Sequence, residues 1–383
     1  MRYASRRAAS VAAFFVAIAL AAPASAARTL TWTVDCARGQ SISRALEHAP
    51  PGLKLALIVR GSCNENVRID RDDVTLQGDP ATGATVNGPA ATSPTIDIAA
   101  NRITVDWLTV TGGGSGINIY GASNVRIGNS VIRNTGLDGI SINESQAISI
   151  DTSKIQYAGG MGIVAYRGGV SIGNSEIQFN KAAGVHIGSG SRLHGNGNTF
   201  GFNGAHGLGV FNASVAMLWN TKITGNGTDP TAFFRQGVYV YFSHAEFRDG
   251  TIADNASSGA VVSGSAHIFN TVITGNGNDG ISAPFGSKLA IDGATISSNK
   301  GNGVVLATNA TGQISNETKI QNNSGHGIAV IEASKLVLWS PITVGGNAGF
   351  GVYCDSAESS AAAISWISFS PPNTAGNASC TGY

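Results

Sequence analysis

The 383-residue sequence has little charge. Asp, Glu, Lys and Arg make up 12% of it, against about 25% in an average soluble domain. The net charge is +1, which argues against a general nucleic-acid surface or an anionic membrane surface. Beyond the first 26 residues, no segment is apolar enough to cross a bilayer. We therefore expect no nucleic-acid partner and no membrane insertion.

The N-terminus has the pattern of a secretory signal peptide. Arg2, Arg6 and Arg7 precede the short apolar run VAAFFVAIALAA, and a small-residue ASA site ends at Ala26. Residues 1–26 are therefore predicted to be removed, and the mature protein to be secreted or periplasmic. Cysteines are few, and all four lie in the exported part, where disulfides form. They sit as one pair near each end, so we expect Cys36–Cys63 and Cys354–Cys380, although four cysteines allow three pairings.

Glycine, by contrast, is abundant, with 51 residues, and it marks an internal repeat. Each anchor glycine precedes a short run of alternating apolar residues, and neighbouring anchors are 21 to 24 residues apart, with a single interval of 30. Period-two alternation in about three short runs per repeat, without a helical period, indicates a solenoid of short strands. The anchors are Gly116, Gly139, Gly162, Gly184, Gly207, Gly237, Gly259, Gly280, Gly303, Gly327 and Gly351.

This pattern predicts an all-β fold, a single parallel β-helix of about 11 marked coils of about 23 residues plus less regular N-terminal coils. We expect an N-terminal cap over residues 27–62, the β-helix over 63–370 and a C-terminal tail over 371–383. Within the cap, Ile42, Ala45, Leu46 and Ala49 have helical spacing, so residues 39–49 predict a short helix that begins at Gln40 or Ser41.

An asparagine ladder supports the register. Asparagine recurs three residues after the last apolar position of successive coils, where its side chain suits a tight turn and can bond along the solenoid axis. We interpret the ladder as structural. Its members are Asn180, Asn203, Asn226, Asn255, Asn276, Asn299 and Asn323.

The repeat resembles that of right-handed parallel β-helix proteins, the pectin lyase-like group that includes pectate lyases, polygalacturonases and alginate epimerases. The resemblance covers roughly residues 50–370 and implies right-handed coils. It also implies a groove along the outward face of the glycine-anchored strands. It does not fix an activity, because one fold hosts many functions.

The outward positions of that face are the second and fourth residues after each anchor glycine. In the coils from Gly116 to Gly237 they are rich in aromatic residues, which suit the apolar faces of sugars. Preference of tyrosine for strands is the competing explanation. We expect substrate-binding residues at Tyr120, Asn143, Phe211, Arg235, Tyr239 and Tyr241.

A catalytic site on this face is a second hypothesis. Removing a proton beside a carboxylate needs a base, a neutralising cation and a proton donor, and His186, Arg167 and Tyr166 offer them in that order. The alternative is that Arg167 merely pairs with Glu144, which holds the same position in the preceding coil.

Two further features have structural alternatives. The 30-residue interval holds an insertion at 225–237, which either borders the binding site or is a tolerated surface loop. The Gly325-His326-Gly327 triplet resembles a catalytic motif of polygalacturonases. However, His326 occupies a slot that Ser, Asp, Met or Asn fills in other coils, so repeat structure accounts for it.

The other family motifs are missing. The sequence has no paired outward carboxylates for hydrolysis, no Asp-Pro-His-Asp of alginate epimerases and no acid cluster for calcium, which needs six to eight oxygens. We therefore predict no cofactor and no metal, and leave enzymatic activity open. The function that fits best is polysaccharide binding along the aromatic face. The alternatives are a lyase or C5-epimerase acting on uronate polymers, and a non-catalytic surface protein that self-associates through Val305, Ala307, Ala329 and Ile331.

Overall fold

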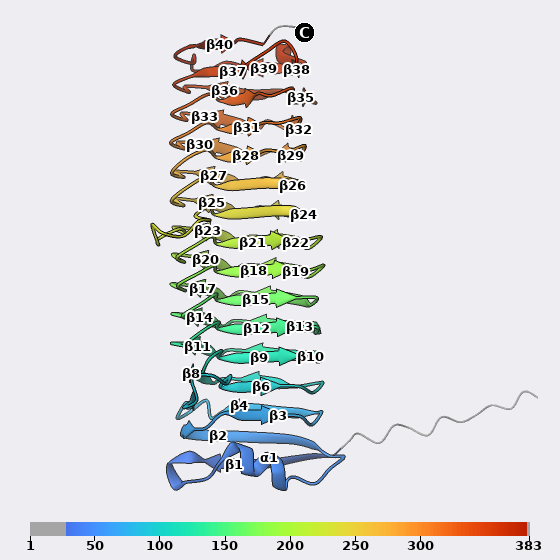
Figure 1. The fold of residues 1–383 in the computed structure, drawn as a ribbon, viewed down its shortest axis with the longest axis vertical. Coiled ribbons are helices and arrows are strands. Elements are labelled where there is room, and N and C mark those ends of the chain that lie inside the picture. Colours follow the sequence, from blue (N-terminus) through green and yellow to red (C-terminus); the bar gives the residue numbers. More distant parts are fainter. Residues whose placement is uncertain (1–27, 381–383) are drawn as a thin grey trace, which may run out of the picture.

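The computed structural model describes residues 28–380, so the predicted signal peptide lies outside the described part. The chain forms one right-handed parallel β-solenoid of about 15 turns, which confirms the predicted fold class. Figure 1 shows the coils stacked as a column, with the N-terminal elements at one end and β40 at the other. No helix in the described residues has the length and apolar character needed to cross a membrane.

Each coil contributes strands to three parallel sheets. The first, here called the glycine sheet, contains the strands that follow the anchor glycines. Its members are β3 (Val67–Ile69), β6 (Ile96–Ile98), β9 (Ile117–Tyr120), β12 (Ile140–Asn143), β15 (Ile163–Tyr166), β18 (Val185–Gly188), β21 (Leu208–Phe211), the first parts of β24 (Val238–Arg248) and β26 (Ala260–Phe269), β28 (Ile281–Ala283), β31 (Val304–Leu306), β34 (Ile328–Val330), β37 (Phe350–Cys354) and β40 (Gly376–Ala378).

The second sheet follows the first within each coil, and the third sheet closes the coil. The second comprises β1 (Thr29–Asp35), the first part of β2 (Lys54–Asn64), β4 (Val74–Gly78), β7 (Thr104–Asp106), β10 (Ser123–Gly128), β13 (Gln146–Asp151), β16 (Gly169–Gly173), β19 (Arg192–Asn196), β22 (Val215–Trp219), the last parts of β24 and β26, β29 (Lys288–Asp292), β32 (Thr311–Ser315), β35 (Lys335–Leu338) and β38 (Ser360–Ala362). The third comprises the last part of β2, β5 (Ala84–Gly88), β8 (Thr109–Gly112), β11 (Val131–Arg133), β14 (Lys154–Gln156), β17 (Glu176–Gln178), β20 (Thr199–Gly201), β23 (Lys222–Thr224), β25 (Thr251–Ala253), β27 (Val272–Thr274), β30 (Thr295–Ser297), β33 (Lys319–Gln321), β36 (Ile342–Gly345) and β39 (Ile367–Ser368).

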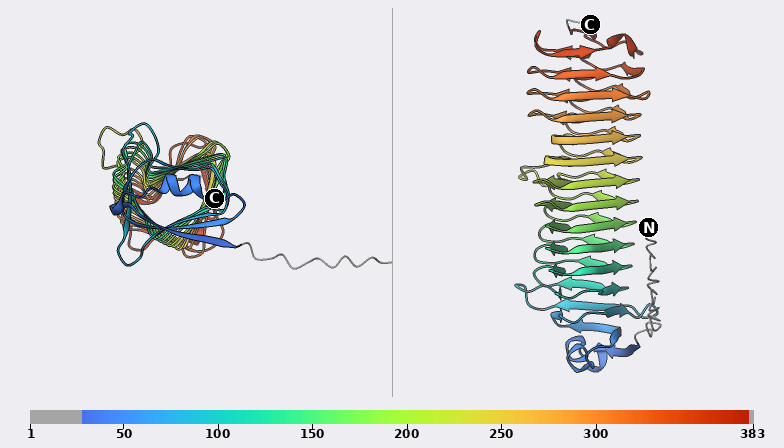
Figure 2. Two further views of the ribbon diagram at one scale, coloured as in Figure 1. Left: turned by 90° about the horizontal axis from the view of Figure 1, so that it is seen from below. Right: turned by 90° about the vertical axis from the view of Figure 1, so that its right-hand side faces the viewer.

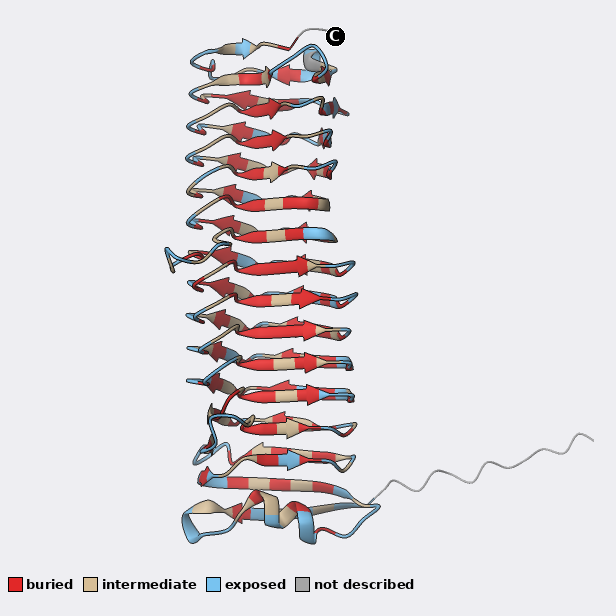
Figure 3. Ribbon diagram, in the orientation of Figure 1, coloured by how far each residue is buried: buried red, intermediate tan, exposed pale blue. Residues whose placement is uncertain are grey.

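The core lies inside the column and is built from stacked aliphatic residues. In β9, Ile117 and Ile119 are fully buried, and the register places Ile140 and Ile142 of β12 directly beside them. The same alternation recurs in every coil, and Figure 3 shows the buried positions repeating up the stack. Because successive strand residues point to opposite faces, the intervening residues of each strand face outward, as the sequence predicted.

The asparagine ladder exists and bonds along the axis. Asn180 Nδ2 donates to Asn203 Oδ1 at 3.0 Å, and each later member repeats this contact at 2.9 to 3.0 Å, continuing through Asn347 and Asn373. The left-handed backbone conformation typical of such a tight turn does not fall on the asparagines themselves. It belongs to the residue before each asparagine, such as Phe179 or Phe202, while the asparagines themselves are buried.

The N-terminal cap contains the predicted helix. Ser41 is the N-cap of α1 (Ile42–His48), which buries Ile42 and Leu46, and Figure 2 shows α1 lying across the end of the column. The Glu65 carboxylate accepts from the backbone N–H groups of Ile42 and Ser43 at 2.7 and 3.0 Å. Burial alone would raise the pKa of Glu65, but these bonds and those from Ser41 and Ser43 hydroxyls lower it. The carboxylate therefore sits ionised at the start of the helix.

Both expected disulfides are present, Cys36–Cys63 and Cys354–Cys380. A short 3-10 helix, η1 (Cys36–Arg38), follows β1, and another, η2 (Ile364–Trp366), lies near the C-terminal end. The N-terminal cap, the β-helix and the C-terminal tail are less sharply separated than the expected boundaries imply. Both β1 and β2 already pair with the stack, so the boundary at residue 63 falls inside β2, and β40 pairs with β37 within the expected tail.

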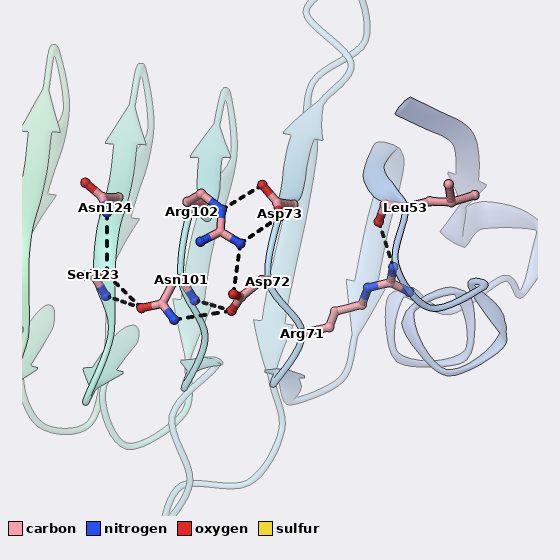
Figure 4. Close-up of polar contacts among 8 residues, drawn as sticks. All are labelled: Leu53, Arg71, Asp72, Asp73, Asn101, Arg102, Ser123 and Asn124. Atoms are coloured by element: carbon pink, nitrogen blue, oxygen red, sulfur yellow. Dashed lines mark hydrogen bonds and ion pairs between the residues drawn. The ribbon is translucent and has the colours of Figure 1, made fainter. Parts of the chain in front are cut away.

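An ion-pair network joins the first, less regular coils at the corner between the glycine sheet and the second sheet (Figure 4). Arg102 donates to Asp73 and Asp72 at 2.8 and 2.9 Å, and Asn101 links Asp72 to Ser123. The Asn101 backbone bond and Arg102 hold the pKa of the Asp72 carboxyl below its ordinary value. These contacts join the first coils at this corner, whereas the asparagine ladder joins the later coils at the corner between the third sheet and the glycine sheet.

Candidate functional site

The outward face of the glycine sheet is arranged in two columns. One column runs through Asn118, Ser141, Val164, His186, Gly209 and Tyr239, each opposite the next in the adjoining strand. The other begins with Tyr120, Asn143, Tyr166 and Gly188, and continues after a break with Phe211 opposite Tyr241. Parallel stacking therefore brings residues about 23 positions apart into contact.

A continuous aromatic surface covers the coils from Gly162 to Gly237. Tyr166 contacts His186 with ring centroids 5.7 Å apart, His186 stacks on Phe211 at 4.6 Å, and Phe211 meets Tyr239 at 5.5 Å. Tyr239 and Tyr241 lie nearly parallel at 6.2 Å. The sequence thus predicted correctly that Tyr166, Phe211, Tyr239 and Tyr241 lie together. Burial raises the pKa of Tyr166, with a smaller contribution from the Asp138 carboxylate, so its hydroxyl stays protonated at neutral pH.

Beneath these rings lies His206, which the sequence analysis did not identify as a site residue. His206 precedes Gly207 in the turn, yet its imidazole leans over the outward face at Gly209, where an added Cβ would come within 2.4 Å of His206 Nε2. His206 is 4% exposed, and its ring centroid lies 5.9 Å from that of His186. The signal in the sequence is Gly209 itself, a glycine in an outward slot that leaves room for a neighbouring ring.

Neither histidine is satisfied by hydrogen bonds. Within residues 28–380, His186 Nδ1 and both ring nitrogens of His206 are buried without a partner. Burial lowers the pKa of His186 to about 4 and, together with the nearby His186, that of His206 to about 3. Both imidazoles are therefore neutral at physiological pH. Buried polar atoms without partners are uncommon, so their concentration at this point of the fold marks it as a site.

The insertion at 225–237 borders the aromatic surface, as one of the two interpretations predicted. Figure 1 shows it as the loop that projects from the column beside β23. Phe234 packs against Tyr239 at 4.7 Å and against His206 at 6.1 Å, so it covers the buried imidazole. Phe233 beside it is 89% exposed. Arg235 Nε donates to the Gly227 carbonyl at 3.0 Å, which fixes the loop.

Other predicted residues lie apart from the cluster. Arg167 donates to Glu144 Oε1 from Nε and Nη2, at 3.1 and 2.6 Å, so the surface pair that the sequence allowed does form. Glu144 belongs to the coil before Tyr166, and His186 belongs to the coil after it. The ion pair with Glu144 therefore draws the Arg167 side chain toward the preceding coil, away from His186. Tyr120 is 55% exposed and stands opposite Asn143, beyond the N-terminal end of the aromatic surface.

A second aromatic row was missed. Tyr157, Phe179 and Phe202 stack in successive coils with centroids 5.5 and 5.4 Å apart and planes within 11°. All three are exposed and have a left-handed backbone conformation. Phe179 and Phe202 directly precede ladder asparagines, and Tyr157 holds the same slot before Ala158. They line a hollow of about 480 Å³ that Thr228 and Asp229 of the insertion close on one side. The signal was present, since Phe179-Asn180 and Phe202-Asn203 recur at the repeat spacing.

The Gly-His-Gly triplet is part of a repeated hydrogen-bond pattern. Asp138 and Asp279, in the same slot of earlier coils, accept the backbone N–H of Met161 and Asn302 at 2.8 Å. His326 Nδ1 likewise accepts from the Phe350 N–H at 2.9 Å, and its ring stacks on Tyr353 at 4.4 Å. The structural interpretation of His326 therefore matches the geometry.

The C-terminal part of the glycine sheet does not expose the apolar surface that the sequence suggested. Val305 is 8% and Ala329 is 4% exposed, so both are buried, while Ala307 and Ile331 are half-buried. Outward positions in a stack of parallel strands are flanked by neighbours above and below, and small side chains there are covered. This removes half of the surface proposed for self-association.

Metal ligands do not gather on this face. Among the described residues, the one group of three side chains close enough to hold an ion is Cys36, Cys63 and Glu65. Its two sulfurs are joined in a disulfide, and the Glu65 carboxylate is occupied by α1, so this group does not fit a metal.

Comparison with known proteins agrees with the architecture. Residues 138–287 match the family model described as "Right handed beta helix region", which agrees with the right-handed parallel β-solenoid of the structure. No protein of curated function matches the sequence.

Three solved structures illustrate the likeness. The pectate lyase Pel9A is 14% identical with a TM-score of 0.51, covering 74% of this chain and 78% of that chain. The alginate lyase of Paenibacillus sp. str. FPU-7 is 15% identical with a TM-score of 0.50, covering 71% and 95%. A mutant of the periplasmic alginate epimerase AlgG is 12% identical with a TM-score of 0.54, covering 92% and 85%. At these identities the likeness establishes the shared fold.

Proposed function

We propose that this protein binds a polysaccharide along the aromatic surface of the glycine sheet, from Tyr166 to Tyr241. The observation that carries the proposal is the unbroken chain of ring contacts across coils whose flanking outward positions hold small side chains. Aromatic rings with polar edges bury the apolar C–H faces of sugars and keep a hydroxyl in water. A column of such rings at coil spacing would contact successive sugars of one chain.

Several features support this reading. Phe233 of the insertion is 89% exposed, and Phe242 at the adjacent corner is 68% exposed. The surface therefore offers solvent-exposed rings as well as packed ones. Structures of the same fold include proteins named for pectate and alginate. Two disulfides and the N-terminal leader pattern fit a secreted or periplasmic location, where such polymers occur.

The test is a binding measurement with a matched pair of variants. Phe242 and Phe285 hold equivalent left-handed corners, both exposed, but only Phe242 contacts the aromatic surface, through Tyr241 at 4.4 Å. Calorimetric titration with pectate, alginate and neutral glycans should show binding that weakens about tenfold in Tyr241→Ala and several-fold in Phe242→Ala.

Phe285→Ala is the control and should bind as the unaltered protein does. Equal binding by all variants, or no binding to any glycan, would overturn the proposal. A circular dichroism spectrum and melting temperature for each variant separate lost binding from lost folding.

A lyase or epimerase acting on uronate polymers is the second candidate. It is favoured by His186, whose buried Nδ1 has no hydrogen-bond partner among the described residues and which lies beside Tyr166 on the outward face. In this version His186 is the base and Tyr166 the proton donor, while Arg167 would have to leave Glu144 to neutralise a carboxylate. Mass spectrometry of incubated polygalacturonate and alginate tests it. Unsaturated or epimerised products that vanish in His186→Ala would establish catalysis, and unchanged glycans would exclude it.

A further inference from the structure

A hollow on the second sheet lies on a different face from the aromatic surface. It has a volume of about 320 Å³ and spans β10, β13, β16, β19 and β22. The outward columns of these strands place Arg126, Ser149, Ser171 and His194 side by side, with Asp151, Gly173, Asn196 and Trp219 in the next column. Ile172 and Gly195 are also part of its lining.

Glycine in one outward slot opens the hollow. A Cβ placed on Gly173 would come within 2.7 Å of Asp151 Oδ1, so the carboxylate occupies the space above the glycine. Any other residue at 173 would displace Asp151. The alternation of Asp151 and Gly173 along the column therefore creates room and directs an acceptor into it.

An aromatic wall closes one side. The rings of His194 and Trp219 lie within 8° of parallel, with centroids 6.4 Å apart, although they come from adjacent coils. His194 is exposed and Trp219 half-buried, so flat apolar surface remains accessible at the edge of the hollow. Such a wall suits the flat, C–H-rich face of a pyranose ring.

The polar groups in the hollow retain unused bonding capacity. Arg126 is exposed and forms no ion pair with any carboxylate in residues 28–380. Asp151 Oδ1 accepts only a long 3.4 Å bond from Asn174 Nδ2. A cation and a carboxylate that face one hollow without pairing offer both a donor and an acceptor for vicinal hydroxyls.

We propose that this hollow is a second sugar-binding site, which takes one pyranose residue of a glycan between Arg126 and Asp151 and against Trp219. The ring face packs on the indole, Asp151 accepts from its hydroxyls, and Arg126 donates to a hydroxyl or a ring carboxylate. The site shares no residue with the aromatic surface of the glycine sheet, so it stands whether or not that surface binds glycan.

The test uses tryptophan fluorescence. The five tryptophans are Trp32, Trp107, Trp219, Trp339 and Trp366, and none belongs to the outward face of the glycine sheet. Short oligosaccharides of galacturonate, of alginate and of cellulose are titrated into the protein. Binding at the hollow should change the emission, and the change should disappear in Trp219→Phe while calorimetry still detects binding.

Further variants sharpen the assignment. Trp219→Ala should weaken affinity about tenfold because the platform is lost. Trp339 is exposed and directly follows β35 of the same sheet, far along the stack from the hollow, so Trp339→Phe should leave both the fluorescence response and the affinity unchanged. Arg126→Gln separates the sugar classes, since only uronate oligosaccharides should then lose affinity.

The outcomes are decisive in both directions. Persistence of the emission change in Trp219→Phe, or its absence with all three oligosaccharides in the unaltered protein, overturns the second site. Tyr241→Ala should keep the emission change, because that residue lies on the other face. Loss of calorimetric binding in Tyr241→Ala with the fluorescence response retained would support both surfaces, and each can fail alone.

Discussion

His206 and His326 occupy the same slot of the repeat, the residue before an anchor glycine, yet their surroundings are opposite. His326 accepts a backbone hydrogen bond from the next coil and stacks on Tyr353. His206 turns onto the outward face, where Gly209 leaves room and Phe234 covers it, and within the described chain its nitrogens have no partner. The repeat therefore sets the backbone position of each histidine, while the 225–237 insertion and Gly209 determine the different surroundings of His206.

The largest expected difference between His206 and His326 is in how much stability each costs the protein at acidic pH. Burial holds the pKa of His206 at about 3, well below its ordinary 6.5. Between these values the unfolded chain binds a proton that the folded chain refuses, so stability present above pH 6.5 is lost as the pH falls. For His206 this loss amounts to about 3 kcal/mol near pH 4.5.

Replacing His206 by phenylalanine should therefore flatten the pH dependence of the melting temperature between about pH 7 and pH 4.5. His326→Phe should flatten it less, because the pKa of His326 is lowered only moderately by partial burial. Scanning calorimetry across that range measures both slopes. Equal slopes in the two variants would show that His206 is not held neutral by burial.

The same two variants are also expected to differ at neutral pH. His326→Phe keeps a ring against Tyr353 but removes the acceptor for the Phe350 N–H, which should lower the free energy of unfolding by about 1–2 kcal/mol. His206→Phe removes buried polar atoms that lack partners, so stability should be unchanged or rise by about 1 kcal/mol. Chemical denaturation gives both values. A comparable loss in the two variants would mean that the hydrogen bond of His326 adds no stability over the unbonded His206.

The fold was largely predictable because its signals are local and repeated. Anchor glycines, alternating aliphatic residues such as Ile117 and Ile119, and the spacing of Asn180 and its successors specify the coils, their register and the ladder. Ser41 before a helical apolar pattern specified the cap helix. The coil features depend on backbone geometry that recurs along the stack, and the cap helix depends on a local N-cap and apolar spacing.

The site was predictable only in part. Alternation placed Tyr166, Phe211, Tyr239 and Tyr241 on one face, since strand residues point outward regardless of context. It could not place His206 or Phe234, because turn and loop side chains follow the space that their neighbours leave. The hollow at Trp219 was not predicted because outward positions were assigned only in the glycine-anchored strands. The same alternation also defines outward positions in the second sheet, where the hollow lies.

The smallest expected effect concerns the cover over His206. Phe234 lies 6.1 Å from His206, whereas Phe233 beside it is 89% exposed, so the loop supplies its own control. Phe234→Ala admits water to the imidazole and should raise the pKa of His206 from about 3 toward 6.5. Phe233→Ala should leave it in place. A titration of the imidazole resonances by NMR measures both, and a pKa unaffected by Phe234→Ala would mean that the packed rings of Phe211 and Tyr239, rather than the insertion, keep His206 dry.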